Sequence, residues 1–297
     1  MNEVAAIVVT YNRKDILLEC IDRLMKLNNT KADIIVVDNA STDGTGDSLK
    51  ALTDSGSVIY CNTGSNTGGA GGFRFGMIEA LRRGYKYLWL MDDDALVSAD
   101  SLDELLKADS ELDGRYGFLS GMAKWTDGNP CKMNVQKTGL KKTLKDYSSP
   151  LVPVIMATFV SFFVRAETVM DVGLPIKEFF IWADDMEYSR RISLKYPCYA
   201  VNNSSVIHKM KVNNKVGIEN EPQERLWRYK YLYRNEVYLY SREGFTGRLF
   251  LFFRVVIHLL RVLFKARESK REKMKIILRS YREGFKFNPE IEYYNKI

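Results

Sequence analysis

Short apolar runs alternate with amphipathic segments through about the first hundred residues. Four such runs, at 4–10, 33–38, 57–61 and 85–91, are mainly apolar and end in polar residues. Runs of this length and composition are typical of strands buried in a parallel sheet. Apolar residues recur at helical spacing after the first run, and 72–83 predicts a further helix. This alternation predicts an α/β fold with a Rossmann-like sheet.

The remaining pattern divides the chain into two parts. After an irregular stretch at 114–160, we expect a strand at 159–165 and a helix at 184–194. From about residue 223 the pattern is helical almost to the end. We therefore expect an α/β domain over 1–215 and a helical, basic, amphipathic region over 216–297.

The charge of the chain follows the same division. The formal net charge is +7, but residues 1–220 carry −2 and residues 221–297 carry +9. A near-neutral body with a basic tail suggests an anion-attracting appendage beside a separate chemical site. The basic residues accompany an apolar helix rather than a polar face with exposed aromatic rings, which argues against nucleic acid as the partner.

Cysteine usage and hydropathy suggest an intracellular protein. The four cysteines are widely spaced, without the spacing of zinc ligands, so we expect reduced thiols. The N-terminus lacks the pattern of an export signal, and an apolar stretch of about 18 residues, as a spanning helix needs, is missing. We therefore expect a cytoplasmic protein.

Three adjacent carboxylates, Asp92, Asp93 and Asp94, follow the fourth apolar run. In extended chain Asp92 and Asp94 point to the same side, where both can bind one divalent cation together with diphosphate oxygens. Asp93 would face the opposite way. The alternative is a solvated acidic turn, which the buried strand before it disfavours.

A second acidic cluster and a histidine follow later in the chain. Asp184 and Asp185 come after four bulky apolar residues, and such a wall raises a carboxyl pKa toward that of a general base. The alternative is N-capping of a helix, which explains one acid but not the pair. His208, at the end of an expected strand, is a candidate third metal ligand, with a purely structural histidine as the alternative.

The segment 66–73 has four glycines in five positions before a helix. It permits close approach to a phosphate or sugar. It matches neither G-x-G-x-x-G nor a P-loop, so it is weak evidence alone.

Together, TYNR, VVDNASTDGT, NTGGAGG, LWLMDDDA, FFIWADDMEYSRR and VIHK resemble the inverting family-2 glycosyltransferases of the GT-A fold. The resemblance covers about residues 5–209. The form W-x-DD-x-E-Y, the glycine-rich segment and the later YRN at 233–235 most resemble bacterial galactofuranosyltransferases. The resemblance implies a GT-A fold with a C-terminal helical extension.

The resemblance also implies roles for individual residues. Asp92, Asp94 and His208 would hold Mn²⁺ or Mg²⁺, and Asp185 would be the catalytic base, with Asp184 as the competing assignment. Substrate binding would involve Thr10, Tyr11, Arg13, Asp38, Asn66, Gly69, Arg74, Asp93 and Trp182. Of these, the first four would border the uridine, Asn66 and Arg74 the diphosphate or sugar, and Trp182 the acceptor pocket.

The function that follows is transfer of galactofuranose from a UDP-sugar donor to a lipid-linked glycan acceptor in surface polysaccharide synthesis. One alternative is a rhamnosyl- or other hexosyltransferase. Another, of a different class, is a non-catalytic nucleotide-sugar-binding scaffold at the membrane.

The segment 248–265 places Arg254, His258, Arg261 and Lys265 on one helical stripe. We expect this helix to lie on the inner membrane surface with the stripe toward lipid phosphates. The alternative is that its apolar face packs on the catalytic domain or on a second subunit of a homo-oligomer. Deleting the tail should then change where the enzyme works before it changes the chemistry.

Overall fold

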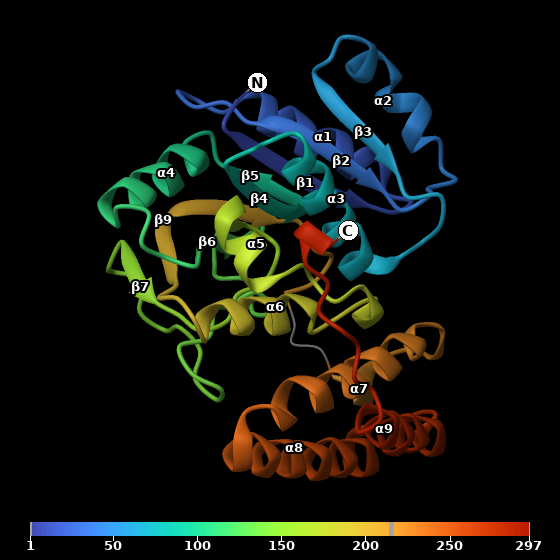
Figure 1. The fold of residues 1–297 in the computed structure, drawn as a ribbon. Coiled ribbons are helices and arrows are strands. Elements are labelled where there is room, and N and C mark those ends of the chain that lie inside the picture. Colours follow the sequence, from blue (N-terminus) through green and yellow to red (C-terminus); the bar gives the residue numbers. More distant parts are fainter. Residues whose placement is uncertain (1, 214–216, 297) are drawn as a thin grey trace.

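The structure is a computed structural model that describes residues 2–213 and 217–296. These residues form a nine-stranded mixed sheet with helices on both faces, and a group of helices that lies below it in Figure 1. The strands are β1 (Val4–Thr10), β2 (Asp33–Asp38), β3 (Val58–Asn62), β4 (Tyr87–Asp92), β5 (Ala95–Val97), β6 (Phe118–Lys124), β7 (Leu151–Pro153), β8 (Phe162–Arg165) and β9 (Tyr199–His208).

The sheet has the order β3-β2-β1-β4-β8-β6-β9-β5, with β7 paired to β9. The first four of these strands are parallel, while β8 is antiparallel to both of its neighbours. The carboxyl ends of β1, β2 and β4 therefore meet at one edge, where ligands bind in open α/β sheets. This confirms the α/β, GT-A-like fold, and the four predicted N-terminal strands agree with the observed ones to within about two residues.

Side chains of β1 alternate between two cores. Val4, Ala6 and Val8 belong to one buried cluster, and Ala5, Ile7 and Val9 to the other. Such alternation is expected of a strand covered on both faces. The two cores fix the sheet edge on which the polar residues lie.

Helices occur where the sequence predicted them, with shifts at their ends, and three further helices, at 45–54, 101–111 and 166–172, were not predicted. They are α1 (Lys14–Met25), α2 (Thr45–Asp54), α3 (Gly68–Arg82), α4 (Ser101–Glu111), α5 (Ala166–Val172), α6 (Asp184–Ser193), α7 (Trp227–Ser241), α8 (Gly244–Lys265) and α9 (Lys270–Gly284). Short 3₁₀ turns occur at Lys177–Phe179, Ile218–Asn220, Gln223–Arg225 and Tyr294–Lys296.

Helix α3 begins at Gly68, four residues earlier than predicted, so the glycine run lies inside the helix. A Cβ on Gly72 would lie 2.6 Å from Val9 Cγ1, and one on Gly76 would collide with Ile7. These glycines therefore allow α3 to pack closely on β1. Gly69 differs, because a Cβ there would meet nothing within 4 Å.

The C-terminal helices α7, α8 and α9 share their own buried cluster, which includes Tyr229, Tyr233 and Ile277. After α9 the chain returns to the sheet domain, and its end lies near α3 in Figure 1. There Glu292 pairs with Arg74 and, at 2.6 Å, with Lys177. The C-terminal end of the helical region is thus tied to the α/β domain.

Candidate metal and acid–base site

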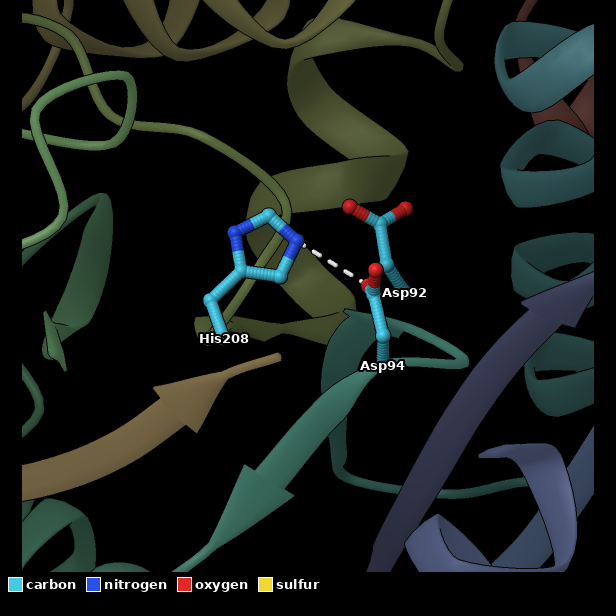
Figure 2. Close-up of side chains that lie close together, drawn as sticks. All are labelled: Asp92, Asp94 and His208. Atoms are coloured by element: carbon cyan, nitrogen blue, oxygen red, sulfur yellow. Dashed lines mark ion pairs between the residues drawn. The ribbon is translucent and has the colours of Figure 1, made fainter. Parts of the chain in front are cut away.

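Two strand pairings bring the predicted metal ligands together. Asp92 ends β4, Asp94 precedes β5, and His208 ends β9. Strand β5 is antiparallel to β9 with Ala95 opposite His208, so Asp94 lies beside the imidazole. The Nε2 atom of His208 is 3.0 Å from Oδ1 of Asp94, the pair joined by the dashed line in Figure 2. One ligand atom from each of the three side chains lies within 4.8 Å of the others.

The chemistry of these groups fits a divalent cation. Asp94 Oδ1 is buried, and the imidazole Nε2 of His208 is the polar group beside it. On its other side His208 Nδ1 lies 2.8 Å from Asn134 Oδ1, an acceptor that places the ring proton on Nδ1 and leaves Nε2 to face Asp94. Burial alone would lower the pKa of His208, but the adjacent Asp94 raises it to about 10. The site therefore favours a positive charge between these side chains.

Asp93 lies with Asp94 in the turn between β4 and β5, so the extended chain that the sequence analysis assumed ends at Asp92. Asp93 accepts hydrogen bonds from Thr10 Oγ1 at 2.8 Å and from Arg13 at 2.7 Å. A second nitrogen of Arg13 donates to Asp94 Oδ2 at 2.7 Å. Arg13 therefore joins the end of β1 to the acidic segment, and it keeps Asp94 Oδ1 directed at the histidine.

The second acidic cluster follows a turn with unusual backbone geometry. Phe180, Trp182 and Ala183 have φ values of 63°, 66° and 65°, a region that side chains other than glycine rarely occupy. Such conformations cost about 1–3 kcal/mol each and persist only where the surroundings impose them. Directly after this turn, Asp184 and Asp185 begin α6.

One buried amide holds the turn. Asn235 of α7 is 0% exposed, and its Nδ2 lies 3.0 Å, 3.3 Å and 2.8 Å from the carbonyl oxygens of Phe179, Ile181 and Trp182. Arg234 donates in turn to Asn235 Oδ1 at 2.9 Å, which orients the amide. The C-terminal region thus determines how the acidic pair is presented.

The carboxyls of the two clusters influence one another. Burial raises the pKa of Asp185 to about 6. Burial and the neighbouring charge of Asp185 raise the pKa of Asp184 well above its usual range, and Asp92 adds to this effect. Burial, followed by the charge of Asp94, also raises the pKa of Asp92, to about 7. The acidic pair is therefore close enough to Asp92 for the charges of these carboxyls to interact.

The residues predicted to contact the donor lie at the same edge of the sheet. Tyr11 follows β1 and is 43% exposed. Asp38 ends β2 and accepts hydrogen bonds from Tyr60 Oη at 2.7 Å and from the Ser41 backbone at 2.8 Å. Asn66 Oδ1 accepts the Gly68 N–H at 2.9 Å and so shapes the entry to α3 beside Gly69.

Arg74 and Trp182 are placed differently from the other predicted residues. Arg74 pairs with Glu292 of the C-terminal tail and is not among the contacts of the acidic clusters in the part of the chain that is described. Trp182 lies in the strained turn, and its ring meets Tyr229 edge-on with centroids 5.0 Å apart. Its partner is thus a residue of α7.

Residues 5–164 match the family model described as glycosyl transferase family 2. The chain belongs to this family. It is therefore a glycosyltransferase, and its acidic edge is the candidate active site.

Two curated relatives refine the comparison for this glycosyltransferase. It is 32% identical over 201 residues to galactofuranosyltransferase GlfT1 of Mycobacterium tuberculosis, and the aligned residues cover 64% of each chain. It is 27% identical over 258 residues to galactofuranosyltransferase GlfT1 of Mycolicibacterium smegmatis, covering 81% of this chain and 84% of the relative. The chain thus spans slightly less than two thirds of the M. tuberculosis relative's length.

A solved structure supports the fold. The mannosyltransferase PcManGT from Pyrobaculum calidifontis, described in complex with GDP-Man and Mn²⁺, superposes with a TM-score of 0.59 at 17% identity. The match covers 97% of this glycosyltransferase and 76% of the other chain.

Three asparagines of the glycosyltransferase site were missed by the sequence analysis as functional residues. Asn134 fixes the ring of His208, and Asn235 holds the acidic turn. Asn39 accepts from Thr67 Oγ1 at 2.7 Å and donates to the Gly68 carbonyl at 3.0 Å, joining β2 to α3. Asn39 was part of a quoted segment and Asn235 of the YRN signature, whereas Asn134 lies in an irregular stretch without any signal.

Helix α8 of the glycosyltransferase is turned opposite to the prediction. Arg254 pairs with the buried Glu236, and the His258 ring lies 5.3 Å from that of Tyr233, so these two members of the basic stripe face α7. Arg261 and Lys265 remain exposed. The opposite face is apolar and exposed, and it consists of Phe245, Leu249, Phe252, Phe253, Ile257, Leu260, Leu263 and Phe264. Among the described residues, no helix is sufficiently long and apolar to cross a bilayer.

Proposed function

We propose that this glycosyltransferase transfers galactofuranose from UDP-galactofuranose to a hydroxyl of a lipid-linked glycan, with inversion, during surface polysaccharide synthesis. The observation that carries the proposal is the cluster of Asp92, Asp94 and His208 facing a carboxyl pair of raised pKa. The donor sugar is inferred from the galactofuranosyltransferases to which the chain is similar. Residues 1–215 would form the catalytic domain, and 216–297 the helical region that completes it.

In this proposal Asp92, Asp94 and His208 hold Mn²⁺ or Mg²⁺. The bound cation would neutralise charge on the diphosphate of the departing UDP. Arg13 keeps Asp94 directed at the histidine, and Asn134 keeps Nε2 of His208 free to act as a ligand. The aspartate oxygens suit Mn²⁺ or Mg²⁺, and the imidazole nitrogen favours Mn²⁺ of these two.

Asp185 acts as the base because it is ionised near neutral pH and less buried than Asp184. It takes the proton from an acceptor hydroxyl while that oxygen bonds to the anomeric carbon from the face opposite the diphosphate. The bond between the anomeric carbon and the diphosphate oxygen breaks, and its electron pair leaves with UDP. Asp184, the more buried of the two, helps to shape the acceptor side with Trp182.

The donor would lie along the ends of β1 and β2. Tyr11 offers an exposed ring to the uracil, and Thr10, Arg13 and Asp38 border the nucleoside. Asn66 and Gly69 would line the diphosphate or sugar, since Gly69 has open space above it. Arg74, on α3, would lie near the diphosphate or sugar. Asp93 would contribute by positioning Thr10 and Arg13, which donate hydrogen bonds to it.

A donor panel tests the proposal. The full chain is incubated with Mn²⁺ and a membrane lipid extract as acceptor source, using UDP-galactofuranose, dTDP-rhamnose, UDP-galactose and UDP-glucose in parallel. We expect product from UDP-galactofuranose, loss of product in EDTA and recovery with Mn²⁺. Product from dTDP-rhamnose alone would support the rhamnosyltransferase alternative, and UDP binding without product from any donor would support the scaffold alternative.

The exposed apolar face of α8 supports a location at the cytoplasmic surface of the membrane. Eight large apolar side chains on one face of this helix are between 43% and 81% exposed, and apolar patches of this kind mark protein or membrane interaction sites. A helix with such a face lies in the membrane interface with its apolar side toward the acyl chains. The lipid-linked acceptor would be presented at the same surface.

Charge favours lipid over a second copy of the chain as the occupant of this face. Residues 244–284 carry eleven Lys or Arg and three acidic residues, a net charge of +8. Two copies meeting through this surface would bring like charges together, whereas an anionic leaflet attracts each basic residue by about 1 kcal/mol.

Vesicle flotation tests this location. The full chain should float with phosphatidylglycerol vesicles and stay in solution with phosphatidylcholine vesicles, and added salt should weaken the binding. A dimer in light scattering together with failure to float would instead support the homo-oligomer.

A further inference from the structure

An aromatic cluster lies directly beside the acidic turn. The Phe180 ring stacks on Tyr231 of α7 at 4.9 Å, and Trp227, one helical turn earlier, meets both rings edge-on at 6.2 Å. Trp227 is 42% exposed, and the other two rings are partly exposed. Rings packed on one another in this way usually belong to a core. Their exposure here therefore indicates a binding surface.

The position of Phe180 connects this cluster to the reaction site. Its carbonyl accepts the Ala70 N–H at 3.2 Å, and a Cβ on Gly68 would collide with that carbonyl. Phe180 thus lies between the start of α3, on the donor side, and α7. Asp184 and Asp185 follow only four and five residues later.

The backbone geometry indicates that this placement is maintained against strain. Phe180 has a φ of 63°, and Asn235 binds the carbonyls on both sides of it, those of Phe179 and Ile181. Strained turns held by a buried polar side chain concentrate at functional sites. A turn that only linked two elements would not need a buried side chain to hold it in a strained conformation.

Charged groups surround the rings. The Arg228 guanidinium lies over Trp227 at 5.5 Å, and Arg234 lies over Tyr231 at 5.0 Å. Trp227, the most exposed of the three rings, lies beside these hydrogen-bond donors and suits a ligand that has C–H groups on one face and hydroxyls at its rim, which describes a sugar ring.

We propose that Phe180, Trp227 and Tyr231 form the subsite for the acceptor sugar ring, with Asn235 as the positioning residue for Phe180. This inference rests on the proposed glycosyl transfer. In it, the α/β domain and helix α7 each contribute one side of the acceptor site. The sugar packs on the rings, and its hydroxyl reaches Asp185.

Saturation-transfer NMR on the full chain tests the subsite, using methyl β-galactofuranoside and methyl α-rhamnopyranoside as probes in the presence of UDP and Mg²⁺. Trp227→Ala and Tyr231→Ala should weaken glycoside binding about fivefold, the loss expected for one ring contact. Trp227→Phe should restore most of it. Phe285→Ala removes an aromatic ring that is 72% exposed elsewhere and serves as the matched control.

UDP affinity, measured by calorimetry, separates this inference from the proposed function. It should stay unchanged in all four variants, since the rings lie on the acceptor side. Glycoside binding that is equal in Trp227→Ala and the wild type, or absent from the wild type, would overturn the subsite. Binding of the rhamnoside alone, dependent on Trp227, would retain the subsite and count against galactofuranose.

Asn235→Ala should weaken binding of the same glycosides and leave UDP affinity unchanged. Asn235→Gln, which keeps the amide donors, should recover part of the loss. A purely structural role would instead lower UDP affinity and glycoside binding together.

Discussion

Adjacent residues of the same type have different chemistry in this site. Asp184 and Asp185 share a helix start, yet Asp184 is almost fully buried and close to the charges of Asp185 and Asp92, while Asp185 is partly exposed. Both pKa values are raised, that of Asp185 to about 6 by burial and that of Asp184 by burial and the charge of Asp185. Asp185, the more accessible carboxyl, is thus the one placed to accept a proton from a substrate near neutral pH.

This difference predicts an acid limb in the rate profile. A base works in its ionised form, so kcat/KM should fall about tenfold per pH unit once the pH drops below the pKa of Asp185. The midpoint should lie near pH 6, the value to which burial raises that pKa. Initial rates at fixed Mn²⁺, measured from about pH 4.5 to about pH 8 so that the range brackets this pKa, give the midpoint.

Asp185→Asn should lower turnover by about 10²-fold or more and leave UDP affinity nearly unchanged. Asp113→Asn, at a side chain that is 83% exposed, is the matched control and should behave as the wild type. Near-normal turnover of Asp185→Asn would exclude this residue as the base and favour Asp184.

Local patterns predicted some of these residues and not others. The sequence identified Asp92, Asp94 and His208 as a group, although Asp93 and Asp94 form a turn and not the extended chain assumed for them. The roles of Asn134 and Asn235 depend on partners 74 and 53 residues away, such as His208 and Trp182. An amide in a helix carries no local sign of which distant carbonyls it will meet.

At the scale of elements, α8 shows why periodicity predicts a helix but not its orientation. The basic residues were correctly placed on one face of the helix, but that face can point either outward or toward a neighbouring helix. Arg254 is drawn inward because Glu236, 4% exposed, lies buried on α7 and needs a partner. The sequence contains both charges, yet their pairing depends on how α7 and α8 pack.

This pairing predicts a large effect on stability. Glu236 accepts from Arg254 Nε at 2.8 Å, so Arg254→Leu leaves a buried carboxylate without its cation. We expect a loss of about 3 kcal/mol in the free energy of unfolding, measured by urea denaturation. Arg261→Leu, at an exposed position of the same helix, is the matched control and should change it by about 0.5 kcal/mol or less.

The double variant Arg254→Leu with Glu236→Gln should recover part of this loss, because it removes both charges together. An Arg254→Leu protein as stable as the Arg261→Leu control would show that the buried pair contributes nothing.

At the scale of the whole molecule, the C-terminal region is less separate than its charge suggested. Asn235 holds the acidic turn, and Glu292 binds Arg74 and Lys177 of the α/β domain. Charge is distributed by segment, with −2 in residues 1–220 and +9 beyond. The contacts indicate instead that different faces of the C-terminal region have different functions. Removal of the entire tail would therefore change location and chemistry together.

A crossed pair of full-length variants distinguishes these two descriptions. Phe252→Ser with Phe253→Ser changes only the outer face of α8, where the rings are 61% and 52% exposed. It should reduce flotation with anionic vesicles about tenfold, since apolar burial is lost, and leave transfer to a water-soluble acceptor unchanged.

Asn235→Ala changes only the inner face of α7. It should float as the wild type does and lose about tenfold or more in transfer to the same soluble acceptor, because the acidic pair is no longer held in place. If both variants lost both properties in proportion, the C-terminal region would act as one unit, and the separation by face would be wrong. If each lost only its own property, a single helical region would serve the membrane with one side and the reaction with the other.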